Sequence, residues 1–169
     1  MSIVMALSDC EVSTGGFLGQ PLNTLSSVVF LIAAVSVFRR RLDRPLALLM
    51  AAALGVVGAG SVLYHGPGGV WAHQVHDWGV ALVGAVGVAA VVVACRVGLA
   101  RRLLLPVSIL GIGALAYVAG RTGGVLCDPG SWLQPHAAWH FLAAGGLAVL
   151  GLAVTRRVVP AVEGPVPVD

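Results

Sequence analysis

Residues 45–65 read PLALLMAAALGVVGAGSVLYH, an apolar run that closes on two residues with side-chain chemistry, Ser61 and His65. From 45 to 64 it carries no charge, and its length is close to the ~20 residues that a helix needs to cross the hydrocarbon core of a bilayer. Four other stretches have the same character: 22–38, 78–97, 103–119 and 137–154. We therefore predict an all-α, polytopic membrane bundle of about five transmembrane helices.

The composition supports a membrane protein. Hydrophobic residues make up 58% of the 169 residues and charged residues only 10%, whereas soluble proteins average about a quarter charged. A soluble bundle would need helices with a charged outer face, but these stretches are apolar nearly all round and rich in glycine and alanine. We expect one transmembrane domain over residues 1–157 and a short disordered tail over 158–169, where prolines recur.

Basic residues predict the orientation. The chain has no lysine, and all arginines except Arg121 flank the predicted cytoplasmic junctions. These are Arg39, Arg40, Arg41, Arg44, Arg96, Arg101, Arg102, Arg156 and Arg157. The positive-inside rule then places the N-terminus outside and the C-terminus in the cytoplasm. The net charge of +3 reflects this distribution, so no nucleic-acid partner is expected. We expect no cleavable signal peptide, because no basic segment precedes a long apolar one before residue 20.

Polar residues gather at one end of the predicted helices. Ser61 and His65 close the second stretch, Asp77 opens the third, and His136 and His140 open the fifth. In the predicted topology all of them lie near the extracytoplasmic face. An ionisable side chain in a membrane helix costs about 2.5 to 3.5 kcal/mol and points to function. The pattern predicts a metal-dependent active site at this face.

The spacing of the histidines suits a metal ion. His136 and His140 are four residues apart, so both imidazoles project from one helix face, and Pro135 suits the first turn of that helix. With His65 they supply three imidazoles, the ligand set of a zinc site that keeps one position open to water. Alternatively, these histidines simply face water or lipid headgroups at the membrane interface.

The remaining polar residues receive roles in this hypothesis. Asp77 would orient the water or take its proton, and the Ser61 hydroxyl would donate to the oxyanion that forms. Ser61 could instead be a packing serine bonded within its own helix. His73 and His76, in the polar loop GPGGVWAHQVHD, are expected at the interface, with His76 the replacement ligand should one of the three not bind. The tryptophans fit an aromatic belt at the outer interface: Trp71, Trp78, Trp132 and Trp139.

Three motifs resemble a known group of membrane proteins. They are SVLYH at 61–65, QVHDW around Asp77, and HAAWH at 136–140. The chain resembles the alkaline ceramidases, within a superfamily that includes progestin and adiponectin receptors and GPI-remodelling lipid hydrolases. The ceramidase branch is suggested by Cys10-Glu11 and by the segment PLNTLSS, which contains Asn23.

The resemblance implies a seven-helix fold, a zinc ion on His65, His136 and His140, and hydrolysis of the amide bond of a ceramide-like lipid that enters from the bilayer. This chain offers five crossings, a shortened version of that fold. Between the third helix and the helix that carries HxxxH, the family has three crossings and this chain has room for one. Because both numbers are odd, the last helix still enters the membrane from the outside. Two alternatives remain open: a zinc-containing lipid receptor or sensor, and a hydrolase of lipid esters.

Two more expectations follow from the resemblance. The alkaline ceramidases hold calcium with acidic residues before and at the start of their first helix. Here Glu11 is acidic and Asn23 lies nearby, but other matching positions are Ser8, Ser13 and Gln20, so we expect calcium to be weak or absent.

The resemblance also implies a disulfide of the Cys10–Cys127 type. Both cysteines are extracytoplasmic in the predicted topology, whereas Cys95 lies at the inner end of the third stretch. The alternative is two free thiols.

Overall fold

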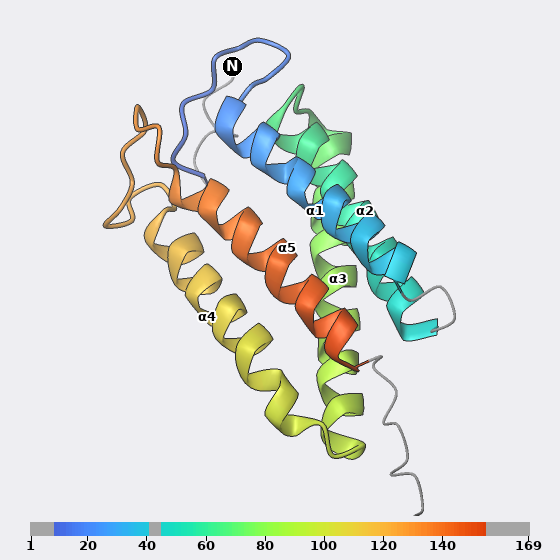
Figure 1. Ribbon diagram of the computed structural model, residues 1–169. Coiled ribbons are helices and arrows are strands. Elements are labelled where there is room, and N and C mark those ends of the chain that lie inside the picture. Colours follow the sequence, from blue (N-terminus) through green and yellow to red (C-terminus); the bar gives the residue numbers. More distant parts are fainter. Residues whose placement is uncertain (1–8, 41–44, 155–169) are drawn as a thin grey trace, which may run out of the picture.

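The computed structural model describes residues 9–40 and 45–154, and these residues form a helical bundle (Figure 1). Over the described residues the helices are α1 (Pro21–Arg40), α2 (Pro45–His65), α3 (Val70–Arg96), α4 (Leu104–Ala119) and α5 (Pro135–Val154), with a short 3₁₀ helix, η2 (Ala100–Leu103), leading into α4. The tail predicted over 158–169 lies outside the described residues.

The five helices, taking η2 together with α4, are each long and apolar enough to cross a membrane. The prediction of about five helices that could span a membrane is thus confirmed for the described residues. Large apolar side chains remain on the outside of the bundle, among them Leu104, Leu115 and Val118 of α4. Such a surface suits contact with lipid. The side of the membrane that each helix end faces stays a prediction.

The third helix is longer than predicted. We expected it to begin near residue 78, after a polar loop, but α3 begins at Val70. Hydropathy marks only the part of a helix that lies in hydrocarbon, and a helix can continue into the interface where its backbone hydrogen bonds are still satisfied. His73 and His76 therefore lie in the first two turns of α3 and not in a loop, and Asp77 lies in the second turn and not at the start of the helix.

The helices pack through small residues. Figure 1 shows α5 between α1 and α4, with α3 behind it. A Cβ atom added to Gly60 of α2 would lie 2.9 Å from the Cα of His76, and one added to Gly79 of α3 would lie 2.7 Å from the Cα of Val57. Neither position has room for a side chain, so glycine allows α2 and α3 to approach backbone to backbone.

One end of the bundle brings distant parts of the chain together. The N-terminal segment 9–20 crosses this end, where α2 finishes and where α1, α3 and α5 begin (Figure 1). The Cys10–Cys127 disulfide ties this segment to the loop between α4 and α5, which confirms the expected bridge. Cys95 is free and exposed near the end of α3.

Candidate metal centre

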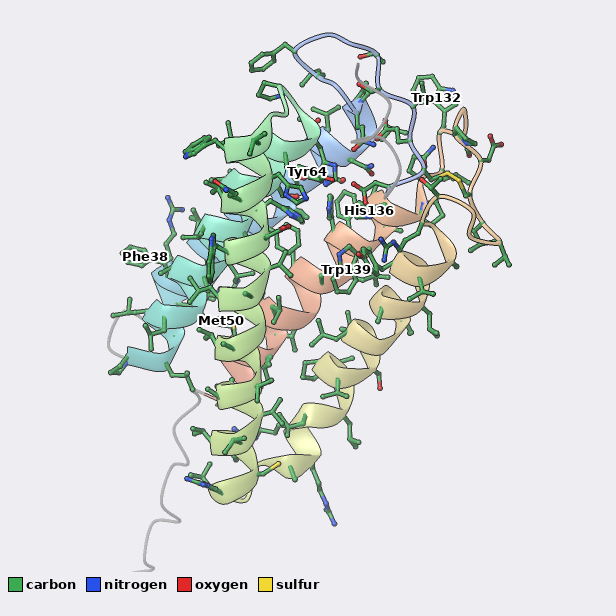
Figure 2. All side chains as sticks on the ribbon, turned by 180° about the vertical axis from the view of Figure 1, so that it is seen from behind. Phe38, Met50, Tyr64, Trp132, His136 and Trp139 are labelled. Carbon is green, nitrogen blue, oxygen red and sulfur yellow. A yellow bond between two sulfur atoms is a disulfide. The ribbon has the colours of Figure 1, made fainter. Side chains whose placement is uncertain are left out.

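Three histidines from two helices form a buried cluster. His65 is the last residue of α2, and His136 and His140 lie in the first two turns of α5 (Figure 2 labels His136). They are 2%, 4% and 2% exposed. Each offers one ligand nitrogen, and these three nitrogens lie within 4.8 Å of one another. The fold thus brings together the three residues that the sequence predicted as ligands.

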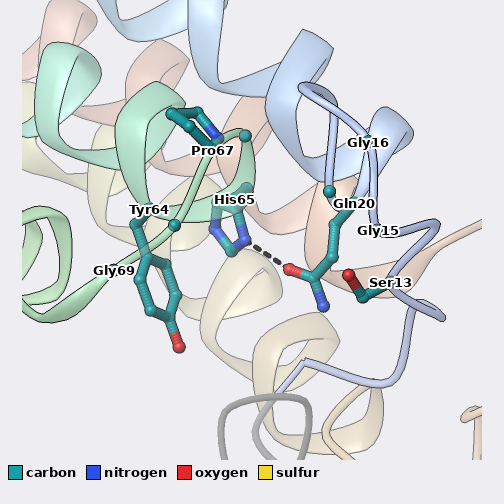
Figure 3. A pocket seen from close by; sticks show the side chains of 11 residues that line it. Ser13, Gly15, Gly16, Gln20, Tyr64, His65, Pro67 and Gly69 are labelled. Atoms are coloured by element: carbon teal, nitrogen blue, oxygen red, sulfur yellow. Dashed lines mark hydrogen bonds between the residues drawn. The ribbon is translucent and has the colours of Figure 1, made fainter. Parts of the chain in front are cut away.

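Gln20 determines which nitrogen of His65 carries the proton. The Gln20 amide nitrogen donates to the backbone carbonyl of Glu11 (2.9 Å), so its oxygen Oε1 faces His65 Nδ1 at 2.7 Å (Figure 3). An amide oxygen only accepts hydrogen bonds, so Nδ1 must be the donor. Nε2 of His65 is then a bare lone pair, and it is buried without a hydrogen-bond partner among the described residues.

A serine does the same for His140. The Ser26 hydroxyl donates its hydrogen to the backbone carbonyl of Asn23 (3.1 Å). Its oxygen lies 2.8 Å from His140 Nδ1 and is therefore free to accept the Nδ1 proton. This arrangement makes Nε2 of His140 the nitrogen available to an ion. Metal-binding histidines commonly use one nitrogen for the metal and give the other to such a partner.

The third histidine, His136, lacks a partner of this kind. Neither ring nitrogen of His136 has a hydrogen-bond partner among the described residues. The nearest charged group is the carboxylate of Asp9, whose Oδ1 lies 3.5 Å from His136 Nδ1 and whose Oδ2 lies 3.8 Å from His65 Nδ1. Sequence reasoning missed Asp9. Its position directly before Cys10 was the available signal, since the bridge draws both residues to this end.

These observations fit a bound cation. A buried polar atom without a partner costs about 1 to 3 kcal/mol, and the cluster contains such atoms on both His65 and His136. One ion among the three imidazoles would satisfy Nε2 of His65 and one nitrogen of His136, and the other His136 nitrogen would still need a partner. Imidazole nitrogens suit zinc, copper, iron and nickel, so the donor set alone leaves the metal's identity open.

Ser61 is buried beside the cluster, in a chain of hydroxyl groups. Its oxygen lies 2.9 Å from that of Ser27, and Ser27 donates to the Asn23 carbonyl at 2.6 Å. The Ser61 hydroxyl is therefore the donor to Ser27. To donate to an oxyanion, this hydroxyl would have to rotate away from Ser27, and its catalytic role remains a prediction.

Asp77 contacts two histidines of α3, His73 and His76, and not the cluster itself. Its carboxylate contacts His76 Nδ1 at 3.0 Å and His73 Nδ1 at 3.4 Å, and its side chain is 58% exposed. The ring of His76 has its centre 6.0 Å from that of His65. Neither His73 nor His76 belongs to the three-histidine group. The role of Asp77 as a base is likewise still a prediction.

Of Glu11 and Asn23, the two residues considered for calcium, only Glu11 has side-chain hydrogen bonds among the described residues. The two carboxylate oxygens of Glu11 accept the backbone N–H groups of Leu22 and Asn23 at 2.7 and 2.8 Å. A carboxylate at this position satisfies free donors at the start of α1 and complements the helix dipole. The side-chain amide of Asn23 is buried and has no hydrogen-bond partner among the described residues.

A cavity of about 260 Å³ reaches His65 from the end of the bundle (Figure 3). Gln20, Tyr64 and His65 line it, together with Ser13 and glycine-rich backbone from the N-terminal segment and the loop after α2. The cavity therefore connects one member of the cluster, His65, with the surface.

Comparison with known proteins adds no relative: no family model, curated protein or solved structure matches the chain. The described residues themselves define its class. It has five apolar helices typical of a multi-pass membrane protein and a buried group of three histidines that could hold a metal ion.

Proposed function

We propose that this protein is a zinc-dependent membrane hydrolase that cleaves the amide bond of a ceramide-like N-acyl lipid. The observation that carries the proposal is the buried cluster of His65, His136 and His140, whose ligand nitrogens lie within 4.8 Å of one another at one end of a membrane-type bundle. Three imidazoles are a known ligand set of catalytic zinc. The motif resemblance to the alkaline ceramidases supplies the substrate class.

The chain's own residues divide the work in this proposal. His65, His136 and His140 would hold zinc, which supplies Lewis acidity and lowers the pKa of a water molecule to about 7. Asp77 accepts a proton from the attacking water and returns it to the leaving amine. Ser61 turns its hydroxyl toward the developing oxyanion. Gln20 and Ser26 keep the imidazoles of His65 and His140 in the tautomer that binds metal.

A lipid suits the surroundings of the site. The headgroup and its amide would sit at the polar end of the bundle, where the cavity reaches His65. The acyl chains would remain in the bilayer, against the exposed apolar side chains of the helices. On this view the active site faces the extracytoplasmic side, as the arginine distribution predicts.

Metal content tests the first half of the proposal. We expect about one zinc ion per chain, measured by mass spectrometry on detergent-purified protein. His136→Ala should lose most of it, because the variant lacks one ligand. His73→Gln, which changes a histidine outside the cluster, should retain it. A wild type without bound metal, even after incubation with zinc, would refute the metal centre.

Lipid turnover tests the second half. Short-chain ceramide offered in large excess should be hydrolysed many times per chain, and the matched lipid ester should be hydrolysed more slowly. Asp77→Asn should abolish turnover while keeping zinc, whereas Asp128→Asn, a carboxylate change in the α4–α5 loop, should behave as wild type. Binding without turnover would favour a receptor or sensor. Preference for the ester would identify an ester hydrolase.

A further inference from the structure

Three consecutive residues in the N-terminal segment are buried although two of them are acidic. Asp9, Cys10 and Glu11 are 4%, 5% and 5% exposed. Glu11 is explained by its bonds at the start of α1, and Cys10 by its disulfide to Cys127. Asp9 has neither explanation. A buried carboxylate without a role is costly, so its surroundings need an account.

The backbone around Cys10 holds Asp9 in place. Cys10 has a φ of 52°, in the left-handed region that residues other than glycine seldom occupy. A tight turn forms there, since the Glu11 N–H bonds to the Asp9 carbonyl, and the Cys10 N–H donates to the Thr122 hydroxyl at 3.2 Å. Such a conformation costs about 1 to 3 kcal/mol and persists only where neighbouring structure enforces it.

Asp9 also completes a pattern. Two of the three histidines present Nδ1 to an acceptor: His65 to Gln20 and His140 to Ser26. His136 has no such acceptor at hydrogen-bond distance, and the Asp9 carboxylate lies 3.5 Å from its Nδ1. A closer approach of these two groups would make the contact a charge-assisted hydrogen bond.

The negative charge of Asp9 is a second reason to connect it with the metal centre. Three neutral imidazoles leave a divalent ion with its full charge inside a largely buried site, which is unfavourable unless an anion lies near. Asp9 brings one negative charge close to both His65 and His136. Asp9 does not belong to the group whose ligand atoms lie within 4.8 Å of one another, so its carboxylate acts on the imidazoles from outside the ligand set.

We propose that Asp9 is a positioning residue of the metal centre, held in place by the Cys10–Cys127 bridge, and that it accepts the Nδ1 proton of His136 and balances the charge of the ion. This inference rests on the proposed metal centre but not on its hydrolytic activity. It assigns to the N-terminal segment a direct part in metal affinity, in addition to covering one end of the bundle.

Zinc affinity of the full-length protein in detergent, measured by competition with a chromogenic chelator, tests the proposal. Asp9→Asn keeps the shape of the side chain and removes its charge, and we expect it to weaken zinc binding about 10- to 100-fold. Its metal-free form should unfold at the wild-type temperature or higher, because a buried charge has been removed. Asp128→Asn is the matched control on the other side of the bridge and should bind zinc as wild type does.

Each other outcome counts against the proposal in a distinct way. Wild-type zinc affinity in Asp9→Asn would overturn it while leaving the metal centre intact. Weaker zinc binding with an equal loss of stability in the metal-free form would assign Asp9 a purely structural role and also overturn it. Absence of zinc binding in the wild type would refute the metal centre itself, and the role of Asp9 with it.

Discussion

The side-chain oxygen of Gln20 lies 2.7 Å from Nδ1 of His65 and dictates the tautomer of that histidine. Gln20 precedes α1 and His65 ends α2, so this contact spans two segments that are separate in the sequence. The Gln20 amide is in turn held by the Glu11 carbonyl, which fixes its orientation. Nε2 of His65 therefore carries a free lone pair that can bind a metal, whether or not a metal is present.

Removing this partner should weaken metal binding without removing a ligand. We expect Gln20→Leu to lower zinc affinity about 10- to 100-fold, because His65 loses the acceptor that orients its ring. Chelator competition measures the change. Gln74→Leu makes the same substitution at an exposed position of α3 and should leave the affinity unchanged. Equal affinity in both variants would show that the tautomer of His65 is determined elsewhere.

The disulfide should contribute stability as well as position. Cys10 and Cys127 are 117 residues apart, and a bridge over a long loop typically stabilises a protein by about 2 to 4 kcal/mol. Cys127→Ser should therefore lower the thermal unfolding temperature in detergent, and a reductant should lower that of the wild type to a similar value. Cys95→Ser, which removes the exposed thiol, should change neither. Insensitivity of the wild type to the reductant would contradict this prediction.

Two glycines of α3 should respond oppositely to alanine. A Cβ at Gly79 would meet the α2 backbone at 2.7 Å, whereas a Cβ at Gly84 would meet no atom within 4 Å. Gly79→Ala should destabilise the bundle, because α2 and α3 must move apart. Gly84→Ala should be neutral or stabilise it by up to about 1 kcal/mol through higher helix propensity. Thermal unfolding of the two variants side by side measures both effects, and equal behaviour would refute the close packing of α2 on α3.

The free thiol of Cys95 offers a test of orientation. The chain has three cysteines, and Cys10 and Cys127 are joined, so Cys95 is the one available for labelling. If the N-terminus is outside, Cys95 near the end of α3 faces the cytoplasm. A membrane-impermeant maleimide should then label it only from the cytoplasmic side of sealed vesicles, with Cys95→Ser as the blank. Labelling from the opposite side would reverse the predicted topology and move the histidine cluster to the cytoplasmic end.

Sequence alone was sufficient to predict the five membrane-type helices and the three histidines of the cluster. The hydropathy and approximate length of each apolar stretch can be read from local composition, because a bilayer core requires about 20 apolar residues per helix. The i and i+4 spacing of His136 and His140 places both on one helix face whatever the rest of the fold does. His65 could be added because an ionisable residue in a membrane helix is costly, and because His65 was predicted to lie at the same depth as His136 and His140.

Only the tertiary structure decided how the cluster is supported. The start of α3 at Val70 escaped prediction because helix beyond the hydrocarbon leaves no hydropathy signal. The partners Gln20, Ser26 and Asp9 come from segments distant from their histidines, and a hydrogen bond leaves no local trace in a sequence. Which residues form the cluster could be predicted from spacing and polarity, but which nitrogen each histidine offers depends on contacts that exist only once the chain has folded.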